Sequence, residues 1–221
     1  LSQLPTFSKT IIGGNEQVVT LFLVIFSVGI AVGSLLCNQL LKNEIAATYT
    51  PVGILGITIF SIDLFFAAGQ ISPAESSALM GVMEYLNTFN HWRILVDLLA
   101  ISICGGIYIV PLYAIIQDCS SISHRSRVFA ANNIINALFM VIAAIAICIM
   151  YYSHFSVTDV FLTLAILNSF VALYITSLLP RAFVKSILQA ILYFCYRLEV
   201  KGLENYQIAG EKTLIVANHL S

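Results

Sequence analysis

Charged side chains are scarce in this chain of 221 residues. They make up only 10% of the sequence, whereas hydrophobic residues make up 59% and the mean hydropathy is +0.94. A soluble domain carries about 25% charged residues, because its surface must face water. The shortage argues against an ordinary soluble domain and indicates a surface covered mostly by lipid.

Other signals are missing as well. The ten basic residues are scattered, so we expect no nucleic-acid partner. The five cysteines show no CxxC or Cys/His spacing and lie mostly in apolar runs, so we expect no metal site, no disulfide and no bound cofactor. The chain has neither an initiator Met nor a signal-peptide pattern, and it stops within what reads as a motif. We interpret it as a fragment of a longer protein.

Long uncharged runs are what the sequence has in place of charge. About 20 apolar residues are enough to cross a hydrocarbon layer of roughly 30 Å. We therefore predict an all-α polytopic membrane protein. Gly29 and Gly33 lie four residues apart in the first run, a spacing that lets another helix approach closely. The predicted transmembrane helices are residues 18–41, 50–69, 94–116, 128–150 and 160–179.

The third and fourth runs form a predicted helical hairpin around a basic turn. No charged side chain occurs from Leu98 to Gln117 or between Arg127 and Thr158. The turn contains Arg125 and Arg127, for which two roles are open: a topological anchor or contacts with lipid phosphate.

The basic residues also predict the orientation. With five spans, eight of the ten fall on one side of the membrane, and only Lys9 and Arg93 fall on the other. Basic residues are enriched on the cytoplasmic side, so the C-terminus is predicted to be cytoplasmic. The eight are Lys42, Arg125, Arg127, Arg181, Lys185, Arg197, Lys201 and Lys212.

The pattern changes after Pro180. Residues 181–197 have apolar positions at helical spacing over a run too short to span, which predicts an amphipathic helix in the interface. Residues 198–221 have a soluble composition and begin a new domain. Within it, residues 213–217 read as a buried strand that ends at Asn218 and His219, a common position for a site in α/β folds.

Two acidic residues lie within or at the edge of a predicted span, Asp63 and Asp97. An ionisable group in a membrane helix usually faces a cavity or pairs with another group, because exposure to lipid costs a few kcal/mol. One interpretation is that both line a substrate path and meet a cationic headgroup or a proton. The other is that Asp97 forms a surface pair with Arg93, one helical turn earlier.

Three asparagines lie at the start of the fourth span, Asn132, Asn133 and Asn136. Asn132 and Asn136 share a helix face, and Asn133 is adjacent to it. They are candidates for lining the substrate path. Hydrogen bonding between packed helices is an equally open interpretation.

The segment Ile-Val-Ala-Asn-His-Leu-Ser resembles the opening of the glycerolipid acyltransferase motif, Asn-His-x-Ser-x-x-x-Asp. Asn218, His219 and Ser221 match, and residues 199–219 resemble the lead-in strand of that family. The resemblance implies that His219 is the general base for acyl transfer, with acyl carrier protein or coenzyme A thioester as co-substrate. The Asp position lies beyond Ser221, so this fragment by itself is expected to be inactive.

Residues 1–180 resemble the C-terminal half of a major facilitator superfamily transporter. The stretches EQVVTLFLVIFSVGIAVGSLLCNQL and GGIYIVPLYAIIQ…RSRVFAANNIINALFMV are similar to lysophospholipid transporters found beside or fused to such acyltransferases. This resemblance implies that the five spans are the eighth to twelfth helices of a twelve-helix bundle.

Together the two resemblances imply a bifunctional protein of the bacterial inner membrane. Its membrane part would move lysophospholipid to the cytoplasmic leaflet, and its soluble part would reacylate it, with acyl carrier protein as a possible partner. Two alternatives are open: an acyltransferase whose membrane part is only an anchor, and a plain facilitator transporter of another substrate.

Overall fold

Helices dominate the computed structural model, which describes residues 2–41, 47–71, 79–178, 184 and 188. No β-strand occurs in these residues, so the all-α prediction for the membrane part is confirmed. Among the described residues, five helices are long and apolar enough to cross a membrane, and each overlaps one of the predicted stretches. They are α2 (Glu16–Leu41), α3 (Thr50–Gly69), α5 (Phe89–Cys119), α6 (Arg125–Tyr152) and α7 (Val157–Leu178).

Helix α5 starts earlier than its apolar run does. It begins at Phe89, so Arg93 belongs to the helix and not to the preceding loop. Its 31 residues span about 46 Å, more than the roughly 30 Å of hydrocarbon. The extra turns carry aromatic side chains that suit a membrane–water interface, and the Trp92 indole Nε1 donates a hydrogen bond to the Leu86 carbonyl oxygen at 2.9 Å.

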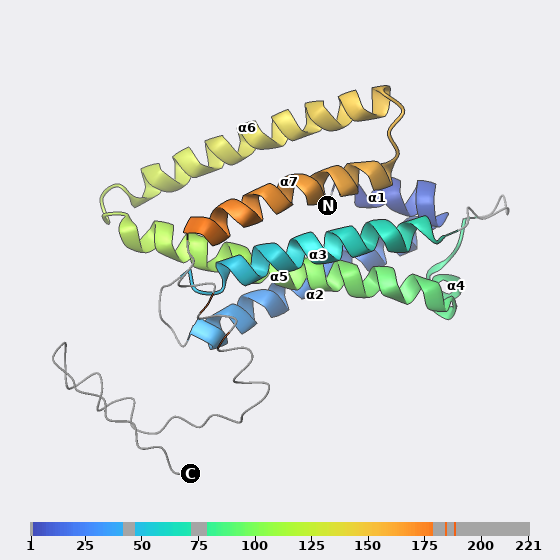
Figure 1. Ribbon diagram of the computed structural model, residues 1–221, viewed down its shortest axis with the longest axis horizontal. Helices are drawn as coiled ribbons and strands as arrows, with labels where there is room; N and C mark the ends of the chain where they lie inside the picture. The colour runs from blue at the N-terminus through green and yellow to red at the C-terminus, as the bar shows by residue number, and fades with distance from the viewer. Residues whose placement is uncertain (1, 42–46, 72–78, 179–183, 185–187, 189–221) are drawn as a thin grey trace, which may run out of the picture. The chain divides into compact units, whose positions relative to one another are not determined.

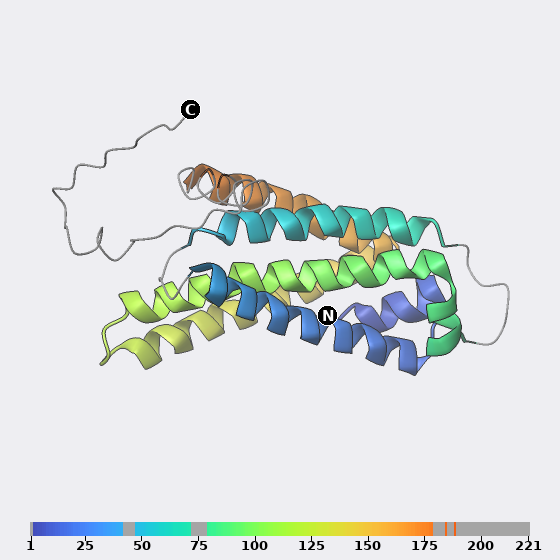
Figure 2. The ribbon, with the colours of Figure 1, turned by 90° about the horizontal axis from the view of Figure 1, so that it is seen from below.

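Four of the long helices pack in the order α2, α5, α3, α7 (Figures 1 and 2). Helix α6 differs, because none of its residues is buried among the described residues. It meets the other helices through a few side chains, such as Phe129, whose ring stacks on Tyr113 of α5 at a centroid distance of 6.1 Å.

Glycines allow α2 and α5 to pack closely. A Cβ atom added at Gly33 would overlap the Ile103 carbonyl oxygen, and one added at Gly29 would overlap the Ser102 hydroxyl oxygen. From the other helix, a Cβ at Gly106 would lie 2.8 Å from the Ile30 carbonyl oxygen. The close approach predicted from the spacing of Gly29 and Gly33 is therefore confirmed.

Pro111 lies inside α5 and is buried. A proline has no N–H, so it leaves the carbonyl four residues earlier, that of Ile107, without its helical hydrogen bond. The Cys37 thiol of α2 donates to this oxygen at an S···O distance of 3.9 Å. A neighbouring helix thus satisfies the carbonyl, as a helix in lipid requires.

One end of the bundle is closed by the short helix α4 (Val82–Asn87), and we call it the α4 end. Here α2 and α5 begin and α3 ends (Figure 1). Tyr85 is fully buried and stacks on His91 at 4.4 Å between ring centroids. Burial raises the pKa of the Tyr85 phenol, so it stays protonated and donates to the His91 carbonyl oxygen at 3.2 Å.

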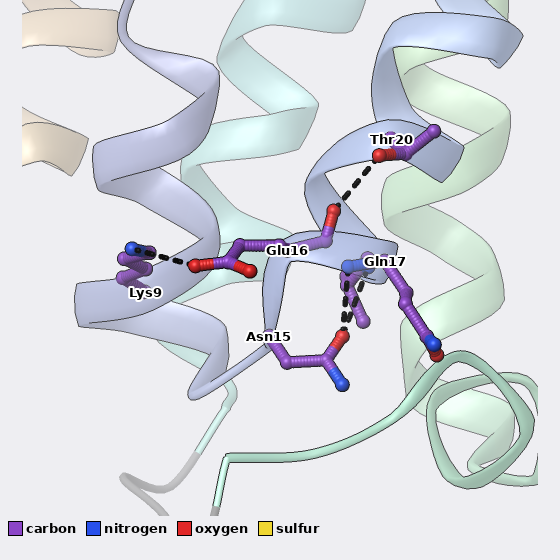
Figure 3. A network of polar contacts seen from close by, with 6 residues as sticks. Lys9, Asn15, Glu16, Gln17 and Thr20 are labelled. Carbon is purple, nitrogen blue, oxygen red and sulfur yellow. Dashed lines mark hydrogen bonds and ion pairs between the residues drawn. The ribbon is translucent and has the colours of Figure 1, made fainter.

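The chain before α2 is fixed at the same end. The segments α1 (Leu4–Phe7) and η1 (Ser8–Ile12) precede a left-handed Gly13, with φ of 70°. Asn15 then caps α2, since its Oδ1 accepts from the backbone N–H of Gln17 at 2.9 Å (Figure 3). The Asn15 N–H donates to the Met80 carbonyl oxygen at 2.9 Å and holds the segment before α4 beside this turn.

The predictions for the C-terminal part fall largely outside the described residues. Of the predicted interfacial helix at 181–197, only Val184 and Leu188 are described, and both are helical and exposed. The predicted start of an acyltransferase domain at 198–221 lies wholly outside them.

Candidate functional site

An ion pair connects α3 and α5 near the α4 end. The Arg93 guanidinium donates from Nε to Oδ2 of Asp63 at 3.0 Å and from Nη2 to Oδ1 of the same carboxylate. Two parallel bonds of this kind fix both the distance and the orientation of the two groups. Both side chains are partly exposed, at 42% for Arg93 and 38% for Asp63. The pair therefore links two helices along one side of the bundle.

Asp97 lies beside this pair but is not the partner of Arg93. The sequence left open a surface pair between these two residues, and the structure instead buries Asp97 to 2% exposure. Its Oδ2 meets no hydrogen-bond donor among the described residues. Asp97 lies four residues after Arg93 in α5, on the same face of the helix. We call Asp63, Arg93 and Asp97 the acidic cluster.

The acidic cluster lies inside two candidate spans but close to their ends. Asp97 is eight residues past the start of α5, or about 12 Å along the helix axis. Asp63 is six residues before the end of α3, or about 9 Å. Helix α5 exceeds the hydrocarbon thickness, so if its excess length is shared between its two ends, the cluster lies just within the hydrocarbon edge at the α4 end.

A second polar cluster joins α5 to α6. The Nδ2 atoms of Asn132 and Asn136 lie 3.4 and 3.5 Å from the Tyr113 hydroxyl oxygen, to which they donate. Asn133 is exposed, and its side chain has no hydrogen bond to another described residue. The structure thus brings two of the three asparagines together on one phenol, a contact between helices that also suits a polar path.

The two clusters are far apart. Tyr113 lies 16 residues after Asp97 in the same helix, which is about 24 Å along its axis. The predicted path residues therefore form two separate polar positions, one near each end of α5.

Three residues that form these polar contacts between helices were not among the predicted site residues. They are Tyr113, Asn168 and Arg93, the last of which pairs with Asp63. The Asn168 side chain of α7 donates to the Thr58 hydroxyl at 2.8 Å and to the Ile54 carbonyl oxygen at 3.2 Å, both on α3. Tyr113 and Asn168 were detectable in principle as polar side chains within apolar runs. The Arg93–Asp63 pairing joins different helices and has no local signal.

His219, the predicted general base, lies outside the described residues together with Asn218 and Ser221. Arg125 and Arg127 lie in the first turn of α6, where the basic turn was expected. In the part of the chain that the structure describes, no group of three or more His, Cys, Asp or Glu side chains is placed to hold a metal ion.

Comparisons of this chain with protein-family models, with curated proteins and with solved structures find no match. What the described site offers chemically is a guanidinium–carboxylate pair with a second, buried carboxyl group beside it at one end of α5, and an amide–phenol cluster at the other.

Proposed function

We propose that the full-length protein is a bifunctional membrane protein that transports lysophospholipid to the cytoplasmic leaflet and reacylates it to diacyl phospholipid. In this proposal residues 1–180 are the C-terminal half of a major facilitator superfamily bundle in a bacterial inner membrane. The soluble part that begins near residue 198 transfers the acyl group from an acyl carrier protein or coenzyme A thioester.

The observation that carries the transport proposal is the acidic cluster within two membrane helices. A helix that only anchors an enzyme needs no ionisable group, and each one placed in hydrocarbon costs a few kcal/mol. Here two carboxyl groups and a guanidinium meet between α3 and α5, where apolar side chains would pack at lower cost. Helices that line a transport path often contain ionisable groups despite this cost.

The cluster also suits the proposed substrate. A lysophospholipid with an ethanolamine headgroup carries an ammonium group that a carboxylate can bind and a phosphate that a guanidinium can bind. Its single acyl chain is apolar and matches the exposed apolar side chains of α6 and α7. The Tyr113 cluster, about 24 Å along α5, supplies polar contacts near the opposite leaflet.

The orientation gives the first prediction. Single cysteines are introduced at Met83 in α4 and at Ser123 in the α5–α6 turn, both exposed, in a full-length protein without its native cysteines. In intact cells we expect a membrane-impermeant maleimide to label position 83 and not position 123, because the basic turn is retained in the cytoplasm. Labelling of position 123 from outside contradicts the proposed topology.

Asp63 gives the second prediction. In the full-length protein we expect Asp63→Asn to reduce lysophospholipid uptake at least about tenfold, equivalent to about 1.4 kcal/mol, because Arg93 loses its partner on α3. The measurement is uptake of labelled lysophospholipid into cells at matched protein levels. Acylation of lysolipid supplied to permeabilised cells should stay unchanged.

Asp118→Asn is the matched control for this substitution, since Asp118 is an exposed residue at the far end of α5. It should leave both uptake and acylation at the parental level. Normal uptake by Asp63→Asn would exclude the acidic cluster from the transport path. Loss of the Asp63→Asn protein from the membrane would assign the pair a structural role.

A further inference from the structure

Trp92 is the only tryptophan of the chain and lies about one turn after the start of α5. It is 49% exposed, and its indole Nε1 donates to the carbonyl oxygen of Leu86 in α4. Its ring therefore offers an apolar face to the outside of the bundle, and its one polar atom is held by the end of α4. A ring with an apolar body and a polar edge suits the boundary between hydrocarbon and lipid headgroups.

Tyr113 lies one hydrocarbon thickness farther along the same helix. It follows Trp92 by 21 residues, or about 32 Å along the helix axis. The hydrocarbon layer is roughly 30 Å thick, and tyrosine is enriched at its boundaries as tryptophan is. A crossing between these two rings leaves about one turn of α5 outside the hydrocarbon at Trp92 and nearly two turns at Tyr113.

Helix α6 repeats this spacing between its own ends. The Asn132 side chain donates to the Tyr113 hydroxyl oxygen, which places these two residues at one level. Tyr152 follows Asn132 by 20 residues, or about 30 Å, and is 88% exposed. It lies at the α4 end, since the hydroxyl of the preceding residue, Tyr151, donates to Oε1 of Gln3, the residue before α1.

Helix α7 carries an exposed aromatic residue at the same end as Tyr113. The Asn168 side chain donates two hydrogen bonds to α3, which runs antiparallel to α7 (Figure 1). Tyr174 lies six residues farther, about 9 Å toward the start of α3, and is 64% exposed. The start of α3 lies beside the second half of α5, because a Cβ atom added at Gly53 would lie 2.9 Å from the Tyr108 nitrogen. Tyr174 is therefore within about one turn of the level of Tyr113.

We propose that two belts of aromatic side chains bind the two interfaces of a phospholipid bilayer. The belt at the α4 end consists of Trp92 and Tyr152, and the belt at the opposite end consists of Tyr113 and Tyr174. The glycerol esters and phosphates of the lipids accept hydrogen bonds from the phenol groups, and the rings pack on the first methylene groups of the acyl chains. Among the described tyrosines, only Tyr108 lies well between the belts, about 7.5 Å from Tyr113.

The belts determine how deep the acidic cluster lies. Arg93 is the next residue after Trp92, so its backbone lies at the boundary, and its side chain is 42% exposed. Asp97 lies five residues after Trp92, about 7.5 Å inside the hydrocarbon. Water and lipid phosphate at the headgroup level can therefore reach Arg93. This inference requires only that the helices cross a bilayer, so it does not depend on lysophospholipid being the substrate.

The experiment measures the depth of Trp92 in the full-length protein, with Trp92 kept as its single tryptophan, in phosphatidylcholine vesicles. The acyl chains carry bromine either near the glycerol or near the terminal methyl group, because bromine quenches the fluorescence of a ring that it contacts. We expect bromine near the glycerol to quench Trp92 at least about twofold more strongly than bromine near the methyl group, since the interface lies at that depth.

Ile59→Trp in a Trp92→Phe protein is the control for depth. Ile59 is 61% exposed and lies near the middle of α3, so bromine near the terminal methyl group should quench a tryptophan there more strongly. Tyr174→Trp in the same background should repeat the pattern of Trp92, because it reports the depth of the opposite belt.

Quenching of Trp92 that is equal for the two bromine positions, stronger for the deeper one, or absent would overturn the proposal. A deep pattern at position 174 would also overturn it, because the two belts would then not lie one hydrocarbon thickness apart. The Trp92 measurement replaces none of the described residues, so a variant that fails to fold cannot account for its result.

Discussion

Replacing His219 by alanine in the full-length protein is expected to reduce conversion of lysolipid to diacyl lipid by about 10²- to 10⁴-fold. The proposed role of His219 is to remove the proton from the lysolipid hydroxyl as it attacks the acyl thioester. Alanine cannot accept that proton. The backbone conformation predicted for residues 213–217 does not depend on the imidazole, so the variant is expected to fold.

The same variant should continue to import labelled lysolipid. His219 lies some 40 residues beyond the last predicted span and on the opposite side of the membrane from the acidic cluster in the proposed topology. The assay follows uptake and diacyl product in the same cells. Lysolipid should therefore accumulate unacylated, a result that separates transport from acylation.

His124→Ala is a suitable control, because His124 is an exposed histidine in the α5–α6 turn whose Nδ1 lies 2.9 Å from the Ser121 hydroxyl oxygen. It should leave both readouts unchanged. Normal acylation by His219→Ala would contradict the proposed role of His219 as general base. It would favour a plain transporter. Asp63→Asn should lower uptake alone, and His219→Ala should lower acylation alone. The two variants together would show that the two activities are separable.

Replacing Gly106 by alanine is expected to destabilise the bundle by about 1–3 kcal/mol. The added Cβ would lie 2.8 Å from the Ile30 carbonyl oxygen and 2.8 Å from the Ser34 amide nitrogen. Both are backbone atoms of α2, so the methyl group is accommodated only if the two helices move apart. Small residues matter at such contacts, because membrane helices associate by close packing and not by burial from water.

Gly105 provides a matched control one residue away. A Cβ at Gly105 meets no heavy atom within 4 Å, so Gly105→Ala should be neutral or slightly stabilising through helix propensity, by at most about 1 kcal/mol. The measurement is the free energy of unfolding of the full-length protein during titration of mixed micelles with a denaturing detergent. Equal stability of the two variants would contradict the close contact between α2 and α5.

The helical content of the membrane part could be predicted from composition alone. Runs such as Val18–Leu41 contain no charged side chain, and a chain in hydrocarbon must satisfy its backbone groups internally, which a helix does. The ends of the helices were harder to predict. Helix α5 begins at Phe89 because polar and aromatic residues continue a helix through the interface, where a criterion based on apolar runs stops.

The candidate site was predicted only as separate residues. Asp63 and Asp97 stood out because carboxyl groups are expensive in lipid, and this holds whatever their partners are. Their partners depend on which helices become neighbours. In the sequence, Arg93 lies one helical turn before Asp97, a spacing that favours a pair between them. In the fold, Arg93 pairs instead with Asp63 on α3, 30 residues earlier.

By itself, then, the sequence determined that the chain forms helices long and apolar enough to cross a membrane, that α2 carries a close-packing face at Gly29 and Gly33, and that ionisable groups lie inside these helices. These properties follow from local composition and periodicity. The tertiary structure alone decided that Gly106 completes the contact with α2, that Tyr113 gathers Asn132 and Asn136, and that Asp97 is buried beside an ion pair it does not share. Each of these depends on which helix faces which, and that is set by packing over the whole bundle and not by any one segment.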